Sequence, residues 1–162
     1  MALTDTASHS VAEIITGMGN NLIRFEIAGH QVISSPTSRH VLQQDGFAPF
    51  KYGIPILSPP NRIKNGSFEF RGKRYTLPLN EPPNHHLHGE MCSNAWELVD
   101  FGASDEQGAY VTSRFHYAAH REIMQYFPHP LSFTITHRLH DGCLHLNGKI
   151  VNEGEDEAPF AF

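Results

Sequence analysis

The sequence predicts an all-β fold, an antiparallel β-sandwich, from its strand periodicity and its turn residues. Apolar and polar residues alternate through 109–120, 131–140 and 143–150, and such long alternation is typical of half-buried strands. Asp141-Gly142 separates the last two segments and is a strong hairpin signal. Many short antiparallel strands joined by long loops favour a two-layer sandwich. With 162 residues, 40% of them hydrophobic, the chain is expected to form a single domain over residues 1–162.

The other expected elements are less regular. A short helix is predicted at 37–44. Residues 45–66 and 78–90 are predicted to be loops, because their prolines remove donors that a β-ladder needs. Long loops on a β scaffold often carry binding residues, so we expect the functional site there. Further strands are predicted at 22–28, 31–35, 67–70, 73–77 and 96–101.

Composition narrows the classes of partner and the compartment. The net charge is −5 and there are only 12 Lys and Arg, so neither nucleic acid nor an anionic membrane is an expected partner. Cys92 and Cys143 lie far apart and form no CxxC pair, which fits a reduced, cytoplasmic setting without disulfides. Residues 1–10 lack the pattern of a signal peptide, and no apolar run reaches the roughly 20 residues that span a bilayer.

Residues 84–90, N-H-H-L-H-G-E, hold three histidines within four positions. In an extended segment His86 and His88 would share a face, but zinc needs three or four ligands. His116 and His120 are predicted on one strand, where four residues span about 13 Å, too far for one metal. A nucleophile is poorly supported, since the sequence contains no G-x-S-x-G and Cys92 is more simply an inert thiol. A metal site, an acid/base pair and ordinary surface or core histidines therefore all remain open from these residues alone.

Arg62 follows the proline-rich loop in P-P-N-R-I and is the second candidate. A guanidinium held by a rigid loop is a fixed fork of donors that suits hydroxyl oxygens, ring oxygens or carboxylates. A surface arginine in a salt bridge is the simpler alternative. Trp96 follows the histidine segment and is expected in the core or in the wall of a cleft.

Several short motifs follow one another along the chain: Asn61-Arg62-Ile63, Gly66-Ser67-Phe68, Gly72, Tyr75-Thr76-Leu77, Asn80, Asn84, Leu87-His88-Gly89 and Trp96. In this order and spacing they resemble the aldose 1-epimerase family, the galactose mutarotases and their hexose-phosphate relatives. The opening N-N-L-I-R-F-E-I-A-G and the later Tyr126-Phe127-Pro128 also resemble family elements, so the resemblance covers nearly the whole chain.

The resemblance implies a galactose mutarotase-like β-sandwich that binds an aldohexose, free or phosphorylated, without metal or other cofactor. In the family, a base removes the proton of the anomeric hydroxyl and an acid protonates the ring oxygen; the ring opens and closes to the other anomer. Asn61 and Arg62 match sugar-binding positions. His88 matches the histidine near the ring oxygen and is the catalytic candidate. His86 matches no position of defined role and is a candidate at the cleft rim for substrate binding.

The resemblance also implies that this chain corresponds to the N-terminal half of the family domain. Asn152 through Pro159-Phe160 matches the segment that leads to the family's principal histidine, and both that histidine and the later glutamate base would follow Phe162. Each positioned proton transfer is typically worth about 10²–10⁴-fold, so we expect weak or no mutarotation from the 162-residue chain. The alternative is a non-catalytic sugar-binding module that forms a homo-oligomer through an exposed sheet edge.

Overall fold

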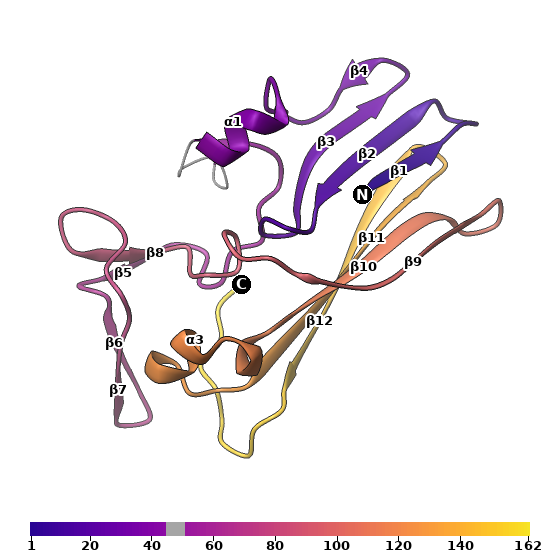
Figure 1. Cartoon of the computed structure of the whole chain (residues 1–162). Helices are drawn as coiled ribbons and strands as arrows, with labels where there is room; N and C mark the ends of the chain where they lie inside the picture. Colours follow the sequence, from indigo (N-terminus) through magenta and orange to yellow (C-terminus); the bar gives the residue numbers. More distant parts are fainter. Residues whose placement is uncertain (45–50) are drawn as a thin grey trace.

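A computed structural model describes residues 1–44 and 51–162 and consists mainly of antiparallel strands (Figure 1). The helical elements in the described residues include α1 (Arg39–Gln44), the 3₁₀ turn η1 (Tyr117–Ala119) and α3 (Arg121–Tyr126). The strands are β1 (Ala2–Asp5), β2 (Ser10–Ile15), β3 (Asn21–Ile27), β4 (His30–Gln31), β5 (Arg62–Lys64), β6 (Ser67–Phe70), β7 (Lys73–Thr76), β8 (His85–Leu87), β9 (Glu97–Ser104), β10 (Gly108–His116), β11 (Leu131–His140) and β12 (Cys143–Asn152).

Two four-stranded sheets form the two layers of the molecule. One has the order β1-β2-β3-β4 and the other the order β12-β11-β10-β9, with antiparallel pairing throughout. The layers meet where inward side chains of the first sheet, such as Ile14 and Leu22, pack on Val111 and Leu139 of the second. The predicted all-β antiparallel sandwich is confirmed. Asp141-Gly142 forms the β11–β12 turn, with positive φ at both residues as a tight hairpin requires.

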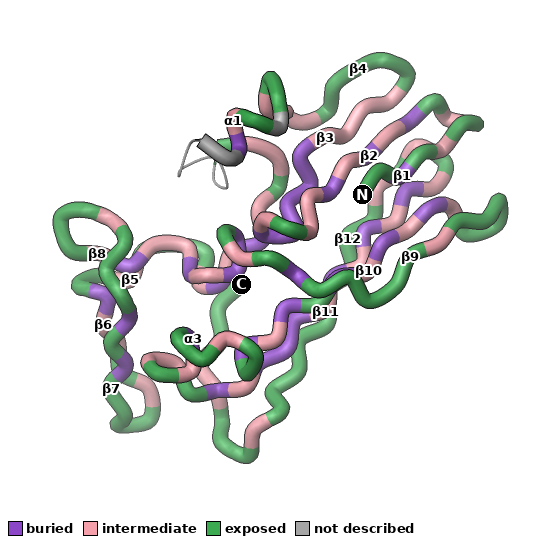
Figure 2. Tube along the Cα trace, in the orientation of Figure 1, coloured by how far each residue is buried: buried purple, intermediate pink, exposed green. Residues whose placement is uncertain are grey.

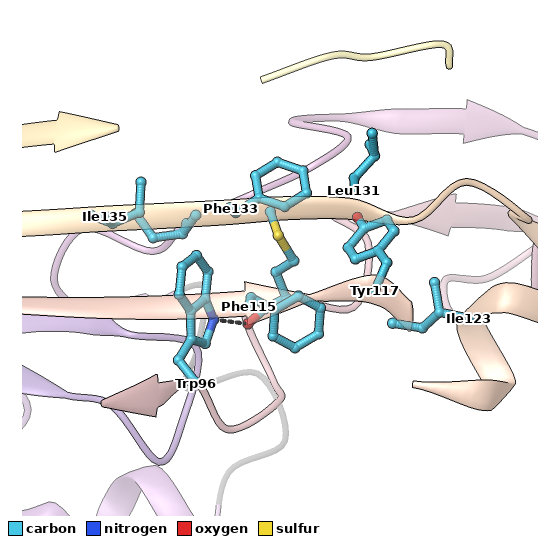
Figure 3. Packing of buried hydrophobic residues seen from close by; sticks show 9 residues of the cluster. Trp96, Phe115, Tyr117, Ile123, Leu131, Phe133 and Ile135 are labelled. Carbon is cyan, nitrogen blue, oxygen red and sulfur yellow. Dashed lines mark hydrogen bonds between the residues drawn. The ribbon is translucent and has the colours of Figure 1, made fainter. Parts of the chain in front are cut away.

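A second, aromatic core lies at the other end of β10 and β11. Trp96, Phe115, Tyr117 and Phe133 pack together there, and Figure 3 shows their rings gathered beside the two strands. Phe115 and Tyr117 meet edge to face, with ring centroids 5.7 Å apart. The indole nitrogen of Trp96 donates a 3.0 Å hydrogen bond to the carbonyl of Met91, so the buried N–H is satisfied. Ile123 of α3 belongs to this core. The two-stranded sheets β5–β8 and β6–β7 lie at one end of the molecule in Figure 1.

Several predicted boundaries are wrong. The segment 109–120 does not continue as a strand, because η1 follows His116 and turns the chain into α3. The strand predicted at 31–35 is reduced to the last residue of β4. The loop predicted at 45–66 contains β5, and within the loop predicted at 78–90 lies its partner β8. Residues 45–50 of that first loop lie outside the described residues. The predicted helix at 37–44 is confirmed as α1.

The second sheet leaves apolar side chains uncovered at its edges. Along β12, Leu146 and Ile150 are 44% and 38% exposed, although their cross-strand neighbours His137 and Phe133 on β11 are buried. Figure 2 shows exposed residues along β12 beside buried ones of β11. On this face of the sheet the side chains of β11 are therefore buried, while those of the edge strand β12 are exposed to solvent. Among the helices in the described residues, none is both long and apolar enough to cross a membrane.

Candidate functional site

A cleft of about 460 Å³ opens between the proline-rich loop, β8 with its following turn, α3 and the C-terminal segment. Three of the four predicted site residues line it: Asn61, Arg62 and His86. The lining is otherwise mainly aromatic and apolar. It consists of Ser58, Pro59, Pro60, Asn61, Arg62, Ile63, Phe68, Leu77, His86, Gly89, Glu90, Tyr117, Ile123, Tyr126, Phe127, Leu131, Pro159, Phe160 and Ala161.

Backbone pairing brings the two loops of the cleft together. Strand β5 pairs antiparallel with β8, which sets Ile63 opposite His86. Next to this pair, Ser58 forms a β-bridge with Gly89. Gly89 has a φ of +65°, and a Cβ built there would lie 1.9 Å from the carbonyl oxygen of Ser58. Only glycine allows so close an approach, so this residue fixes the spacing of the two loops.

Arg62 is held in a bidentate ion pair with Glu81. Its Nε and Nη2 each lie 2.5 Å from one carboxylate oxygen, and its backbone N–H donates to the side chain of Asn61 at 2.8 Å. The hydrogen bond between the two side chains raises the pKa of Arg62 and lowers the pKa of Glu81. The guanidinium is therefore a charged fork with a set orientation, and the two N–H groups of Nη1 and the second N–H of Nη2 are its remaining donors.

His86 is buried, with 1% of its surface exposed, and its orientation is fixed by one hydrogen bond. Nδ1 lies 2.7 Å from the carbonyl oxygen of Pro78, which can only accept, so Nδ1 carries the proton. In the neutral ring Nε2 then has the lone pair and can accept a hydrogen bond from a ligand hydroxyl.

His88 lies beside the cleft, and among the described residues it does not belong to the lining. Strand β8 ends at Leu87, and His88 has a φ of +63°. The alternation of a strand therefore stops before His88, and the expectation that His86 and His88 share one face is wrong. The backbone N–H of His88 donates to the carbonyl of Asn61 at 3.4 Å, which ties the histidine segment to the sugar-binding candidates.

The side chain of Asn80 makes two hydrogen bonds to the backbone of β8. Its side chain accepts from the N–H of Leu87 at 2.6 Å and donates to the carbonyl of Leu87 at 3.0 Å. These two hydrogen bonds hold Leu87, the last residue of β8, against Asn80. The orientation of His86 therefore depends on contacts on both sides of the loop.

Tyr126 and Glu90 are polar lining residues that were not predicted from the sequence to belong to the site. The hydroxyl of Tyr126, the last residue of α3, donates to Oε1 of Glu90 at 3.1 Å. Glu90 is the last residue of the N-H-H-L-H-G-E segment and could have been noted there as a candidate. Its orientation toward the site, however, depends on the turn at Gly89, where φ is positive. Glu81 was missed as well, because its pairing with Arg62 is set by the β5–β8 register.

A sequence-family model and several solved structures match this chain. The sequence model of the aldose 1-epimerase family matches residues 2–162. The chain belongs to the aldose 1-epimerase family. The resemblance expected from the sequence motifs is confirmed, and with it the galactose mutarotase-like fold.

Several solved structures match this chain over part of their own length. A galactose mutarotase-like protein from Clostridium acetobutylicum is 26% identical, with a TM-score of 0.85; the match covers 94% of this chain and 46% of that one. A protein from Synechocystis sp. PCC 6803 is 22% identical, with a TM-score of 0.78 and coverage of 99% and 50%. A galactose mutarotase-like protein from Lactobacillus casei ATCC 334 is 17% identical, with a TM-score of 0.72 and coverage of 98% and 46%. The chain spans about half the length of these structures.

Cys92 and a metal site were the other hypotheses raised by the sequence of this epimerase-family chain. Burial raises the pKa of the Cys92 thiol to about 11, so the sulfur is protonated and unreactive near neutral pH. In residues 1–44 and 51–162, no group of three or more His, Cys, Asp or Glu is arranged to hold a metal ion. His116 lies instead 2.9 Å from Glu153, at the end of β10.

Proposed function

We propose that the cleft binds an aldohexose and that the chain contributes to the interconversion of its α and β anomers. The observation that carries this proposal is the convergence of Asn61, Arg62 and His86 on one cleft, from two loops separated in sequence. Family membership supports a sugar as the ligand class. Aromatic walls with a few fixed polar groups suit a sugar, which has apolar ring faces and hydroxyls at its edge.

The chemistry follows from what each group can do. In mutarotation a base takes the proton of the C1 hydroxyl and an acid supplies a proton to the ring oxygen, while the C1–O5 bond breaks. Rotation about C1–C2 and reclosure then give the other anomer. Arg62 and Asn61 would hold hydroxyls, and Nε2 of His86 would accept from one of them. His88 is proposed to act near the ring oxygen, next to the backbone of Asn61.

Sugar titration followed by NMR tests the proposal, with a matched pair of arginine variants. Arg62→Ala removes the charged fork of the cleft, whereas Arg114→Ala removes an exposed arginine that pairs with Glu97 on β10 and β9. We expect R62A to weaken the affinity for D-galactose or D-glucose by about tenfold or more, since a charge-assisted hydrogen bond is lost. R114A should bind as the parent does. Equal affinity in all three proteins would refute the assignment of the cleft.

Polarimetry on freshly dissolved α-anomer measures turnover separately. After correction for spontaneous mutarotation, the 162-residue chain is expected to accelerate the reaction weakly or not at all. A rate close to that of efficient epimerases would show that its own residues supply both proton transfers.

The open edge of β12 supports a second proposal, a homodimer. All ten residues of β12 pair with β11, but the other edge of the strand is exposed over most of its length. A two-fold axis through Gly148 would set Leu146 of each copy opposite Ile150 of the other, on the same face of a continuous sheet. Light scattering should then give twice the mass of 18.2 kDa, and Leu146→Lys should return the protein to a monomer. A monomer at high concentration overturns this proposal.

A further inference from the structure

Glu90 is a carboxylate in the cleft wall whose position is set by backbone contacts. Gly89 before it is fixed against Ser58, and the carbonyl of Glu90 accepts from the N–H of Ser93 at 3.3 Å and from the side chain of Asn94 at 2.8 Å. The side chain is half-buried, and its Oε1 accepts the single hydrogen bond from Tyr126. Since a carboxylate offers about four acceptor positions and Glu90 is a lining residue of the cleft, this side chain has further acceptor capacity for a ligand.

The negative charge of Glu90 acts on the groups around it. Burial is the main reason that the pKa values of Tyr117 and Tyr126 are raised, and the charge of Glu90 raises both further. It has the same sign of effect on Cys92. Three side chains from two different segments therefore lie within electrostatic range of this carboxylate.

No cation in the described lining compensates that charge. Arg62 is the single lysine or arginine among the lining residues, and its guanidinium is already paired with Glu81. Arg62, Glu81 and Glu90 together carry one net negative charge. A sugar phosphate or a uronate would bring a second negative charge close to Glu90, and like charges within several ångströms cost on the order of tenfold or more in affinity.

We propose that Glu90 is the specificity-determining residue of the cleft, where it accepts a hydroxyl of an uncharged aldohexose and disfavours anionic sugars. This inference rests on the proposed function, because it assumes that the cleft binds a sugar. It assigns a substrate class within that function, neutral hexoses as opposed to hexose phosphates and uronates.

The test compares one neutral and two anionic probes by titration at pH 7.5: D-galactose, galactose 6-phosphate and D-galacturonate. The wild-type chain should prefer galactose by about tenfold or more, and the preference should shrink as ionic strength rises. Glu90→Gln keeps the shape of the side chain and should remove most of the preference. Glu106→Gln, on the exposed β9–β10 turn, changes the net charge equally and should leave the preference intact.

The outcomes separate the two proposals. If the wild-type chain binds all three sugars equally, or if E90Q retains the full preference, the role of Glu90 is wrong while sugar binding stands. If the wild-type chain binds none of the three, the proposed function itself is overturned. Should E90Q fail to fold, which circular dichroism would show, the wild-type preference and its dependence on ionic strength decide the question.

Discussion

Replacing Gly89 by alanine tests how the two loops of the cleft are held together. A Cβ at this position would lie 1.9 Å from the carbonyl oxygen of Ser58 and 2.7 Å from its carbonyl carbon, and φ is +65°. An alanine in the left-handed region costs roughly 1–2 kcal/mol. Forcing extra volume against packed neighbours typically costs about 1–3 kcal/mol more. We therefore expect G89A to lower the free energy of unfolding by about 2–5 kcal/mol.

Gly72 provides the matched control, because it has the same strain without the close contact. Its φ is +74°, and the described residues place no heavy atom within 4 Å of the added Cβ. G72A should then cost only about 1–2 kcal/mol. In a chain of this size each kcal/mol corresponds to about 2–4 °C in melting temperature, so the two variants should differ by several degrees.

Urea unfolding followed by circular dichroism measures both variants, and NMR titration with sugar measures the cleft. G89A should lose affinity because Ser58 and Gly89 must separate, whereas G72A should bind as the parent does. Equal unfolding midpoints for the two variants would refute the reasoning, and so would a G89A protein with unchanged sugar affinity.

Three further predictions concern the core and the ion pair. Burial lowers the pKa of His137 to about 4, below its unfolded value near 6.5. Because the unfolded chain binds more protons in this range, the free energy of unfolding should fall by about 3 kcal/mol as the pH drops from 6.5 to 4. Urea unfolding at pH 7 and pH 4.5 should show that H137L loses less of this free energy than the wild-type chain does. Trp96→Phe removes the donor to the Met91 carbonyl and should cost about 1–3 kcal/mol in the same assay, with an unchanged midpoint contradicting it. Glu81→Gln should weaken hexose binding several-fold because Arg62 loses its fixed orientation, and an unchanged dissociation constant would argue against that role.

The strands that are long and regularly alternating were predictable from the sequence. Segment 131–140 became β11 with the predicted bounds, because one face of this strand is buried and period-2 patterning reports burial. Segment 143–150 became β12 (Cys143–Asn152) although most of its residues are exposed; the strand is held by the Asp141-Gly142 turn and by pairing with β11. Strands β1 and β2 were missed. Residues 1–10 are largely polar and gave no periodic signal for β1. Strand β1 pairs with β2, and β2 pairs with β3, so both strands depend on this register rather than on local preference.

The site shows the same division at the level of single residues. Asn61, Arg62 and His86 were identified from motif and loop chemistry, and the structure brings all three to one cleft. Glu81 and Glu90 were not, because each acquires its role from contacts across 19 and 36 residues of sequence. No local sequence pattern predicts such long-range pairings. Gly89 can be recognised in the sequence as a possible turn residue, but its close contact with the carbonyl of Ser58 is visible only in the structure.

The polar groups of the cleft share one property that bears on affinity: each is oriented by a contact that exists without ligand. Arg62 is fixed by Glu81, His86 by the carbonyl of Pro78, and Glu90 by Tyr126. Ordering a long side chain on binding costs about 0.5–1.5 kcal/mol, so a site whose fork, imidazole and carboxylate are already oriented avoids several such costs. Removing one of these supports should therefore weaken sugar binding even where the contacting residue itself is unchanged, which is what E81Q measures for Arg62.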